Sequence, residues 1–174
     1  MFGNLERSRI IAYSAVFIGL ITLGSWISIP CIPVPFTLQT LFVLLAGTVM
    51  RRHAVIPVSL YVILGALGLP LFHNGIAGVG VLLGPTGGYL IGFIVAALIS
   101  GLAYEYPSRP VRICGLVAAT LVIYTFGIVW LMYSLGREFL PAFYAGALPF
   151  IIGDAIKAGA AYLIAERLPL KISG

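Results

Sequence analysis

The chain has 174 residues, of which 61% are hydrophobic and 9% are charged, and its formal net charge is +5. Soluble domains usually contain about 25% charged residues, so this composition argues against a water-soluble enzyme, a nucleic-acid-binding protein and a secreted disulfide-rich domain. It is also too apolar for a disordered chain. We therefore expect an integral membrane protein whose surroundings are a lipid bilayer and not nucleic acid.

Long stretches without charge predict six membrane-spanning helices. Residues 10–50, 53–104 and 113–136 contain no Asp, Glu, Lys or Arg, and one crossing needs about 20 residues. Glycine and proline clusters divide these stretches. We expect an all-α, polytopic membrane protein in which residues 1–174 form one transmembrane domain, with an outer glycine-rich loop at about 70–88 and spans at about 10–29, 36–50, 54–69, 86–104, 111–135 and 142–165.

The positions of the basic residues predict the orientation in the membrane. Arg137, next to Glu138, lies in a loop on one side of the six spans. The other side carries Arg7, Arg9, Arg51, Arg52, Arg109, Arg112, Arg167 and Lys171. Because Lys and Arg gather in cytoplasmic loops, we expect both termini in the cytoplasm and the protein in the plasma membrane.

The chain offers few groups for covalent chemistry. Cys31 and Cys114 are expected at opposite faces of a membrane about 30 Å thick, whereas a disulfide joins Cα atoms roughly 6 Å apart. His53 and His73 are likewise expected at opposite faces, so no metal site is expected. The glycine-rich run at 84–88 is not followed by the Gly-Lys-Ser/Thr of an ATP-binding loop. We expect neither enzymatic activity nor a cofactor.

Asp154 and Lys157 are the most informative polar residues, because they lie inside the last expected span. A charge near the centre of a span costs about 2.5–3.5 kcal/mol, and a spacing of three residues places both side chains on one helix face. One interpretation is a structural ion pair in the bundle. The other is a binding site, in which the carboxylate accepts from N–H groups and the ammonium donates to a carbonyl, as a cyclic urea would require.

The outer loop at 70–88 supplies further candidate binding residues. It contains six glycines between positions 75 and 88, and long loops in compact proteins are usually functional. Asn74 and Tyr89 could provide hydrogen bonds at its rim, whereas His73 is interpreted as a loop residue at the membrane interface.

The run Pro35-Phe-Thr-Leu-Gln-Thr places Gln39 and two threonines at the outer end of the short second span. Proline-interrupted or short spans often border binding sites. The alternative is that the threonines only satisfy local backbone groups.

Small residues on the first span indicate a surface for another helix. Ala15 and Gly19 are four residues apart, a spacing that allows close helix packing, and Ala12 and Ser14 are expected to broaden this face. The face predicts a membrane partner or self-association.

Motifs distributed from the first to the last span resemble one family. These are Ile27-Ser-Ile-Pro, Pro35-Phe-Thr-Leu-Gln-Thr-Leu, Leu45-Ala-Gly, Gly65-x-x-Gly-Leu-Pro, Gly84-Pro-Thr-Gly-Gly-Tyr-Leu-Ile-Gly-Phe and Asp154-x-x-Lys157. Together they resemble the BioY family of biotin transporters, the substrate-binding (S) components of energy-coupling factor (ECF) transporters. The segment after Leu69-Pro70 is less rich in glycine than is typical of the family, and Gly19 stands where alanine is common.

The resemblance implies a six-helix S-component bundle that captures biotin at the outer face and delivers it inward. It also implies assembly with a transmembrane coupling protein and two ABC-type ATPases. By the same resemblance, Asp154 and Lys157 would hold the ureido ring with help from Asn74, and Ala15 and Gly19 would form the docking surface. We expect Gly84 and Gln39 at the binding site as well, and a pocket lined by Phe36, Phe72, Tyr89 and Phe150.

Two other functions remain open at this point. The chain could be an S component for another vitamin, such as thiamine or riboflavin, or a structural membrane protein in which Asp154 and Lys157 only stabilise the bundle. The motif around Asp154 favours biotin over the other vitamins. Whether the chain works alone or only with the ATPase module is left open.

Overall fold

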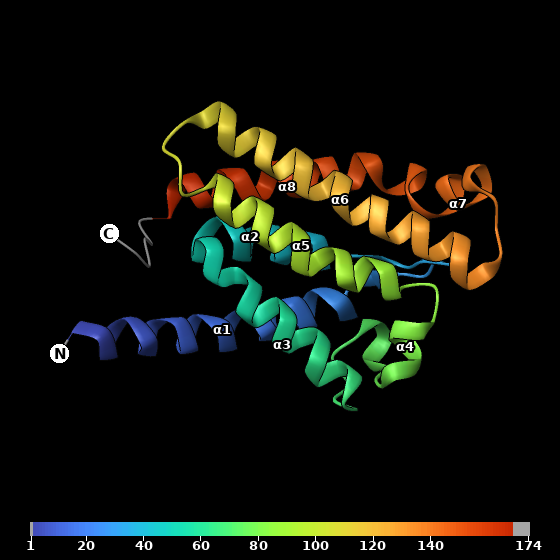
Figure 1. Ribbon diagram of the computed structural model, residues 1–174, viewed down its shortest axis with the longest axis horizontal. Coiled ribbons are helices and arrows are strands. Elements are labelled where there is room, and N and C mark those ends of the chain that lie inside the picture. Colours follow the sequence, from blue (N-terminus) through green and yellow to red (C-terminus); the bar gives the residue numbers. More distant parts are fainter. Residues whose placement is uncertain (1, 169–174) are drawn as a thin grey trace.

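The computed structural model describes residues 2–168, and most of this range is helical (Figure 1). Short 3-10 turns lie at Arg51–Ala54, His73–Gly75 and Leu148–Phe150. The principal elements are α1 (Phe2–Trp26), β1 (Ser28–Ile29), β2 (Phe36–Thr37), α2 (Gln39–Met50), α3 (Val55–Ala66), α4 (Val79–Leu83), α5 (Gly87–Ala103), α6 (Arg109–Leu135), α7 (Phe139–Gly146) and α8 (Ile151–Arg167).

Six of the described helices correspond to the six predicted spans: α1, α2, α3, α5, α6 and α8. Four stretches are long and apolar enough to cross a membrane, namely Leu5–Trp26, Gln39–Ala66, Arg109–Leu135 and Phe139–Arg167, and α5 is a shorter apolar helix. The stretch from Gln39 to Ala66 reverses at Arg51, whose φ is 54°, and so provides two helices. The expected polytopic all-α fold is confirmed.

Several boundaries differ from those expected at about 10–29, 36–50, 142–165 and 70–88. The first helix ends at Trp26 and the second begins at Gln39, because the residues between them form an antiparallel hairpin that pairs Ser28 with Thr37. The last span is divided between α7 and α8 near Pro149, which has no backbone N–H to continue a helix. The outer loop contains α4. Apolar composition alone does not reveal these interruptions.

The basic segments lie together at one end of the molecule. In Figure 1 the start of α1, the turn between α2 and α3, the start of α6 and the end of α8 are all on the left, in agreement with the expected orientation. Arg52 donates two hydrogen bonds to Glu105, at 2.6 and 2.9 Å, and Arg112 pairs with Glu166 at 2.6 Å. These pairs join helix ends that are far apart in the sequence. Lys171 lies outside the described residues.

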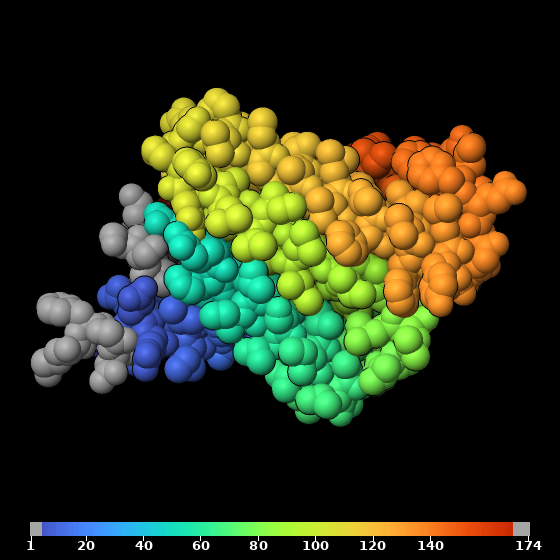
Figure 2. All heavy atoms as spheres, in the orientation of Figure 1, coloured from blue at the N-terminus to red at the C-terminus, as the bar shows by residue number. Residues whose placement is uncertain are grey.

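Close backbone packing joins α5 to α6. Figure 2 shows α5 between α3 and α6 on the viewed face, with α1 at the edge. A Cβ added at Gly88 would collide with the carbonyl oxygen of Phe126 and the Cβ of Trp130. Glycine at this position therefore allows the two helices to approach each other directly.

We predict that Gly88→Ala lowers the free energy of unfolding by about 1–3 kcal/mol, because the added methyl group forces α5 and α6 apart. Gly19→Ala is the matched control, since a Cβ there meets nothing within 4 Å, and it should leave stability within about 1 kcal/mol of the parent. Unfolding of the purified, ligand-free proteins in detergent provides the comparison. Equal stability of the two variants would show that α5 and α6 do not depend on this contact.

Candidate ligand-binding site

The second helix is short and begins beside a buried cavity. α2 has 12 residues, which at 1.5 Å per residue give about 18 Å, well short of the roughly 30 Å hydrocarbon core. The strand β2 directly precedes α2, so we place it within the part of the hydrocarbon core that α2 is too short to cross. Backbone groups of β2 that are not paired with β1 then need partners inside the protein. Irregular backbone is tolerated at such depth where it lines a cavity.

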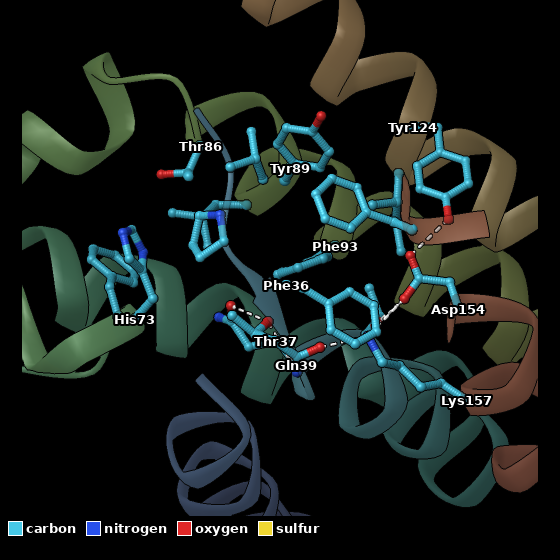
Figure 3. A pocket seen from close by; sticks show the side chains of 17 residues that line it. Phe36, Thr37, Gln39, His73, Thr86, Tyr89, Phe93, Tyr124, Asp154 and Lys157 are labelled. Atoms are coloured by element: carbon cyan, nitrogen blue, oxygen red, sulfur yellow. Dashed lines mark hydrogen bonds and ion pairs between the residues drawn. The ribbon is translucent and has the colours of Figure 1, made fainter. Parts of the chain in front are cut away.

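A cavity lies among β2, α2, α5, α6 and α8 (Figure 3). Its free volume is about 50 Å³, much less than the roughly 300–1,000 Å³ of typical small-molecule pockets. Side chains must therefore move before a ligand of that size can enter. The lining residues are Val34, Pro35, Phe36, Thr37, Gln39, Thr40, Phe72, His73, Thr86, Tyr89, Leu90, Phe93, Ile123, Tyr124, Phe150, Asp154 and Lys157.

The carboxylate of Asp154 is buried and accepts three hydrogen bonds. Its Oδ1 accepts from the hydroxyl of Thr40 at 2.9 Å and from Nζ of Lys157 at 2.8 Å. Its Oδ2 accepts from the hydroxyl of Tyr124 at 2.7 Å. The donors come from α2, α8 and α6, so three helices hold this one group.

Lys157 is also buried and its ammonium group has several partners. Nζ donates to the carbonyl oxygen of Thr37 at 2.5 Å as well as to Asp154, and it lies 3.6 Å from the ring centroid of Phe36. A cation over an aromatic face gains electrostatic energy when desolvated. Phe36 in turn stacks on Phe150 with centroids 5.8 Å apart. The ion pair is thus neutralised and hydrogen-bonded beside the cavity.

Gln39 connects the cavity to the outer loop. Its amide oxygen accepts from the hydroxyl of Thr37 at 3.0 Å, and its amide nitrogen donates to the hydroxyl of Tyr61 at 2.7 Å. Tyr61 donates onward to the carbonyl oxygen of Leu71 at 3.0 Å. A movement of Gln39 at the cavity can therefore be transmitted through Tyr61 to Leu71 in the loop after α3.

The structure brings five of the seven candidate binding residues to the cavity. Phe36, Gln39, Tyr89, Asp154 and Lys157 line it. Tyr89 contributes its ring, because its hydroxyl points away and donates to the carbonyl oxygen of Gly146 at 2.7 Å (Figure 3). The expected aromatic lining by Phe72 and Phe150 is also present.

Asn74 and Gly84 lie outside this cavity. Asn74 is exposed, and its side-chain oxygen accepts from the hydroxyl of Ser28 at 2.8 Å. The carbonyl oxygen of Gly84 accepts from the indole nitrogen of Trp130 at 2.9 Å. Gly84 borders a neighbouring outer groove of about 270 Å³, which shares His73 and Thr86 with the cavity.

Sequence reasoning did not identify several lining residues. Tyr124 and Phe93 come from α6 and α5, and nothing in the local sequence distinguishes them from other aromatic residues of apolar spans. His73, interpreted as an interfacial loop residue, lies at the cavity. Burial lowers the pKa of its imidazole below the usual value, so the ring is neutral at pH 7.

The predicted docking face is exposed at Ala12, Ala15 and Gly19 of α1. Ser14 is buried with an unpaired hydroxyl, so the expectation that it broadens this face is wrong. One hundred degrees of rotation per residue turns Ser14 away from Ala15 and towards the bundle.

No three His, Cys, Asp or Glu side chains meet at a metal site within residues 2–168. Cys31 and Cys114 are both free and exposed.

A bundle of helices that are apolar enough to span a membrane, packed around a cavity lined by Asp154 and Lys157, defines a multi-pass membrane protein. Comparison with known proteins gives the family. Residues 3–173 match the model of the BioY family, and the chain belongs to that family.

The relatives are named as transporters rather than enzymes. A probable biotin transporter BioY of Pyrococcus horikoshii is 42% identical over 163 residues, covering 93% of this chain and 97% of the relative. The biotin transporter BioY of Thermotoga maritima is 43% identical over 157 residues, covering 89% and 92%. Such a multi-pass transporter belongs to the plasma membrane.

A solved structure shares the fold. It is the crystal structure of the S-component for biotin from an ECF-type ABC transporter, with a TM-score of 0.85 and 27% identity. The match covers 97% of this chain and 94% of that chain. The expectation of an S-component-like bundle is therefore confirmed.

We predict that Lys157→Met destabilises the ligand-free protein by about 3–5 kcal/mol, because it leaves the carboxylate of Asp154 buried without its counter-ion. The double variant Asp154→Asn/Lys157→Met should recover much of this loss. Glu166→Gln is the control at the more exposed pair with Arg112 and should cost about 1 kcal/mol or less. Equal losses in Lys157→Met and Glu166→Gln, measured by unfolding in detergent, would contradict the proposed burial of the pair.

Proposed function

We propose that this chain is a biotin-binding S component that captures biotin at the outer face of the membrane and delivers it inward with an ATP-driven ECF module. The observation that carries the proposal is the buried Asp154–Lys157 pair, which faces a cavity and is held by hydrogen bonds from three other elements. The relatives named as biotin transporters support the choice of ligand.

The chemistry of the pair matches the ureido ring of biotin. A carboxylate accepts hydrogen bonds from ring N–H groups, and an ammonium donates to the ring carbonyl. In the proposed complex the carbonyl of biotin takes over a donor of Lys157 that now bonds the Thr37 carbonyl. The rings of Phe36, Tyr89 and Phe150 provide apolar surface for the rest of the bicyclic ligand.

Ligand entry requires local rearrangement, because the cavity is smaller than a biotin molecule. Phe36 belongs to β2 of the hairpin, and Nζ of Lys157 from α8 lies over its ring. A shift of this hairpin would open space beside Asp154 without moving α6 or α8. Asn74 and Gly84 lie on the neighbouring loop, and we propose that they approach the ligand only when this loop closes over it.

Energy for release must come from partners. The sequence has no ATP-binding loop, and the relative of known structure is titled a component of an ECF-type ABC transporter. We assign the coupling protein to the exposed face of α1 around Ala15 and Gly19. These small side chains let another membrane helix approach closely.

Thermal unfolding with ligands tests the substrate. Biotin at 100 times its Kd should add about 2.7 kcal/mol of stability, which raises the unfolding midpoint of a protein of this size by about 5–10 °C. Thiamine and riboflavin should produce no shift. A shift with thiamine or riboflavin instead would change the vitamin, and no shift with any of them in a folded sample would favour the structural alternative.

Variants at the pair test the site. Asp154→Asn and Lys157→Ala should each weaken biotin binding by about tenfold or more, because each leaves a buried polar partner of the ligand unsatisfied. Glu166→Gln is the control that keeps the cavity intact. Binding of labelled biotin as tight in both pair variants as in the parent would refute the assignment.

Bulky residues on α1 test the docking surface. Gly19→Trp should abolish biotin uptake by cells that express the whole module, while purified protein binds biotin with unchanged affinity. Ile113→Trp, at an exposed position of α6, is the control and should preserve uptake. Normal uptake by Gly19→Trp would place the partner on another face.

A further inference from the structure

The Asp154 carboxylate has one acceptor position left for a ligand. An ionised carboxylate offers about four lone-pair sites, two on each oxygen. Oδ1 uses two of them, with Thr40 and Lys157, whereas Oδ2 uses one, with Tyr124. The remaining site is therefore on Oδ2, the oxygen that Tyr124 holds.

We infer that Tyr124 is a positioning residue, which fixes the carboxylate of Asp154 so that the free lone pair of Oδ2 faces a ligand N–H. The hydroxyl of Tyr124 donates to Oδ2 at 2.7 Å from α6, on the opposite side of the carboxylate from Lys157 (Figure 3). Thr40 and Lys157 hold only the other oxygen. The planar carboxylate rotates about its Cβ–Cγ bond as one unit, so the hydroxyl of Tyr124 adds the third hydrogen bond, and the only one on Oδ2, that limits this rotation.

The ring of Tyr124 also borders a second hollow, outside the cavity. Besides the cavity, it lines an apolar groove of about 470 Å³ on the outside of α6, α7 and α8, together with Thr120, Ile128 and Ala155. The ring thus separates the charged cavity from an apolar surface. Tyr124→Phe keeps this wall and removes only the hydroxyl, which makes it a clean test of the hydrogen bond.

The sequence provides a direct probe of the contact. Asp154 is the only aspartate in the chain, so cell-free synthesis with aspartate carrying a heavy carbon isotope in its side-chain carboxyl labels one group. Isotope-edited infrared spectra then report the carboxylate stretch of Asp154 alone. This measurement needs no ligand and is independent of the proposed function, on which the ligand-binding part of the inference rests.

We expect the labelled band to change frequency in Tyr124→Phe and to stay unchanged in Thr120→Val. Thr120 is one turn earlier on α6 and borders the groove, but its hydroxyl donates to the carbonyl oxygen of Leu116 at 2.9 Å. Replacing all tyrosines with a ring-fluorinated tyrosine, whose hydroxyl is a stronger donor, must also shift the band. This replacement takes the place of Tyr124→Phe if that variant does not fold. An unchanged band in these proteins overturns the inference.

Binding of labelled biotin completes the test. Tyr124→Phe should weaken binding by about tenfold, as loss of a hydrogen bond to a charged group does, and Thr120→Val should change it by less than about twofold. A shifted band with unchanged affinity for biotin would show that Tyr124 contacts Asp154 but would overturn its role in positioning the carboxylate for the ligand. A parent protein whose band does not shift and whose stability does not rise with biotin would instead refute the proposed function. The ligand-free spectra would still decide whether Tyr124 holds Asp154.

Discussion

Burial of one ion pair in the membrane is the constraint on which the rest of this structure depends. Removing two charges from water costs several kcal/mol for each ion unless excellent geometry and additional hydrogen bonds compensate. Here the compensation comes from Thr40 on α2, Tyr124 on α6 and the carbonyl of Thr37 in β2. The carbonyl is available because α2 begins only at Gln39 and leaves Thr37 outside the helix. The late start of α2 therefore supplies one of the hydrogen-bond partners that the buried ion pair needs.

The same contacts explain how the ion pair can be stable without a ligand and still be able to bind one. Lys157 is satisfied by a backbone carbonyl and an aromatic ring, both of which a ligand carbonyl and a ligand ring can replace. Asp154 keeps its own partners and one unused lone pair. A ligand of matching polarity can thus enter without leaving either charge unpaired. The basic, ion-paired end of the bundle and the exposed face of α1 lie apart from this cavity, which separates ligand capture from partner contacts in the proposed function.

Sequence reasoning predicted what depends on local composition and energetic cost. Uncharged stretches predicted the six helices, basic residues predicted the shared end of the termini, and the cost of intramembrane charge selected Asp154 and Lys157. It missed what depends on long-range contact. The hairpin before Gln39 has an apolar sequence like that of the flanking helices, so its strands could not be distinguished from them. Tyr124 donates a hydrogen bond to Asp154, which is 30 positions further along the chain. Asn74 was proposed from the outer loop and from the resemblance, and in the structure its side-chain oxygen accepts a hydrogen bond from Ser28.

The central claim is that biotin binds directly to the carboxylate of Asp154. Its most direct test is a biotin titration of protein labelled only at that carboxyl, followed by isotope-edited infrared spectroscopy. The account predicts a saturable change in the Asp154 band that follows binding of labelled biotin over the same concentration range. Saturation of the protein with biotin while the Asp154 band stays unchanged would contradict it.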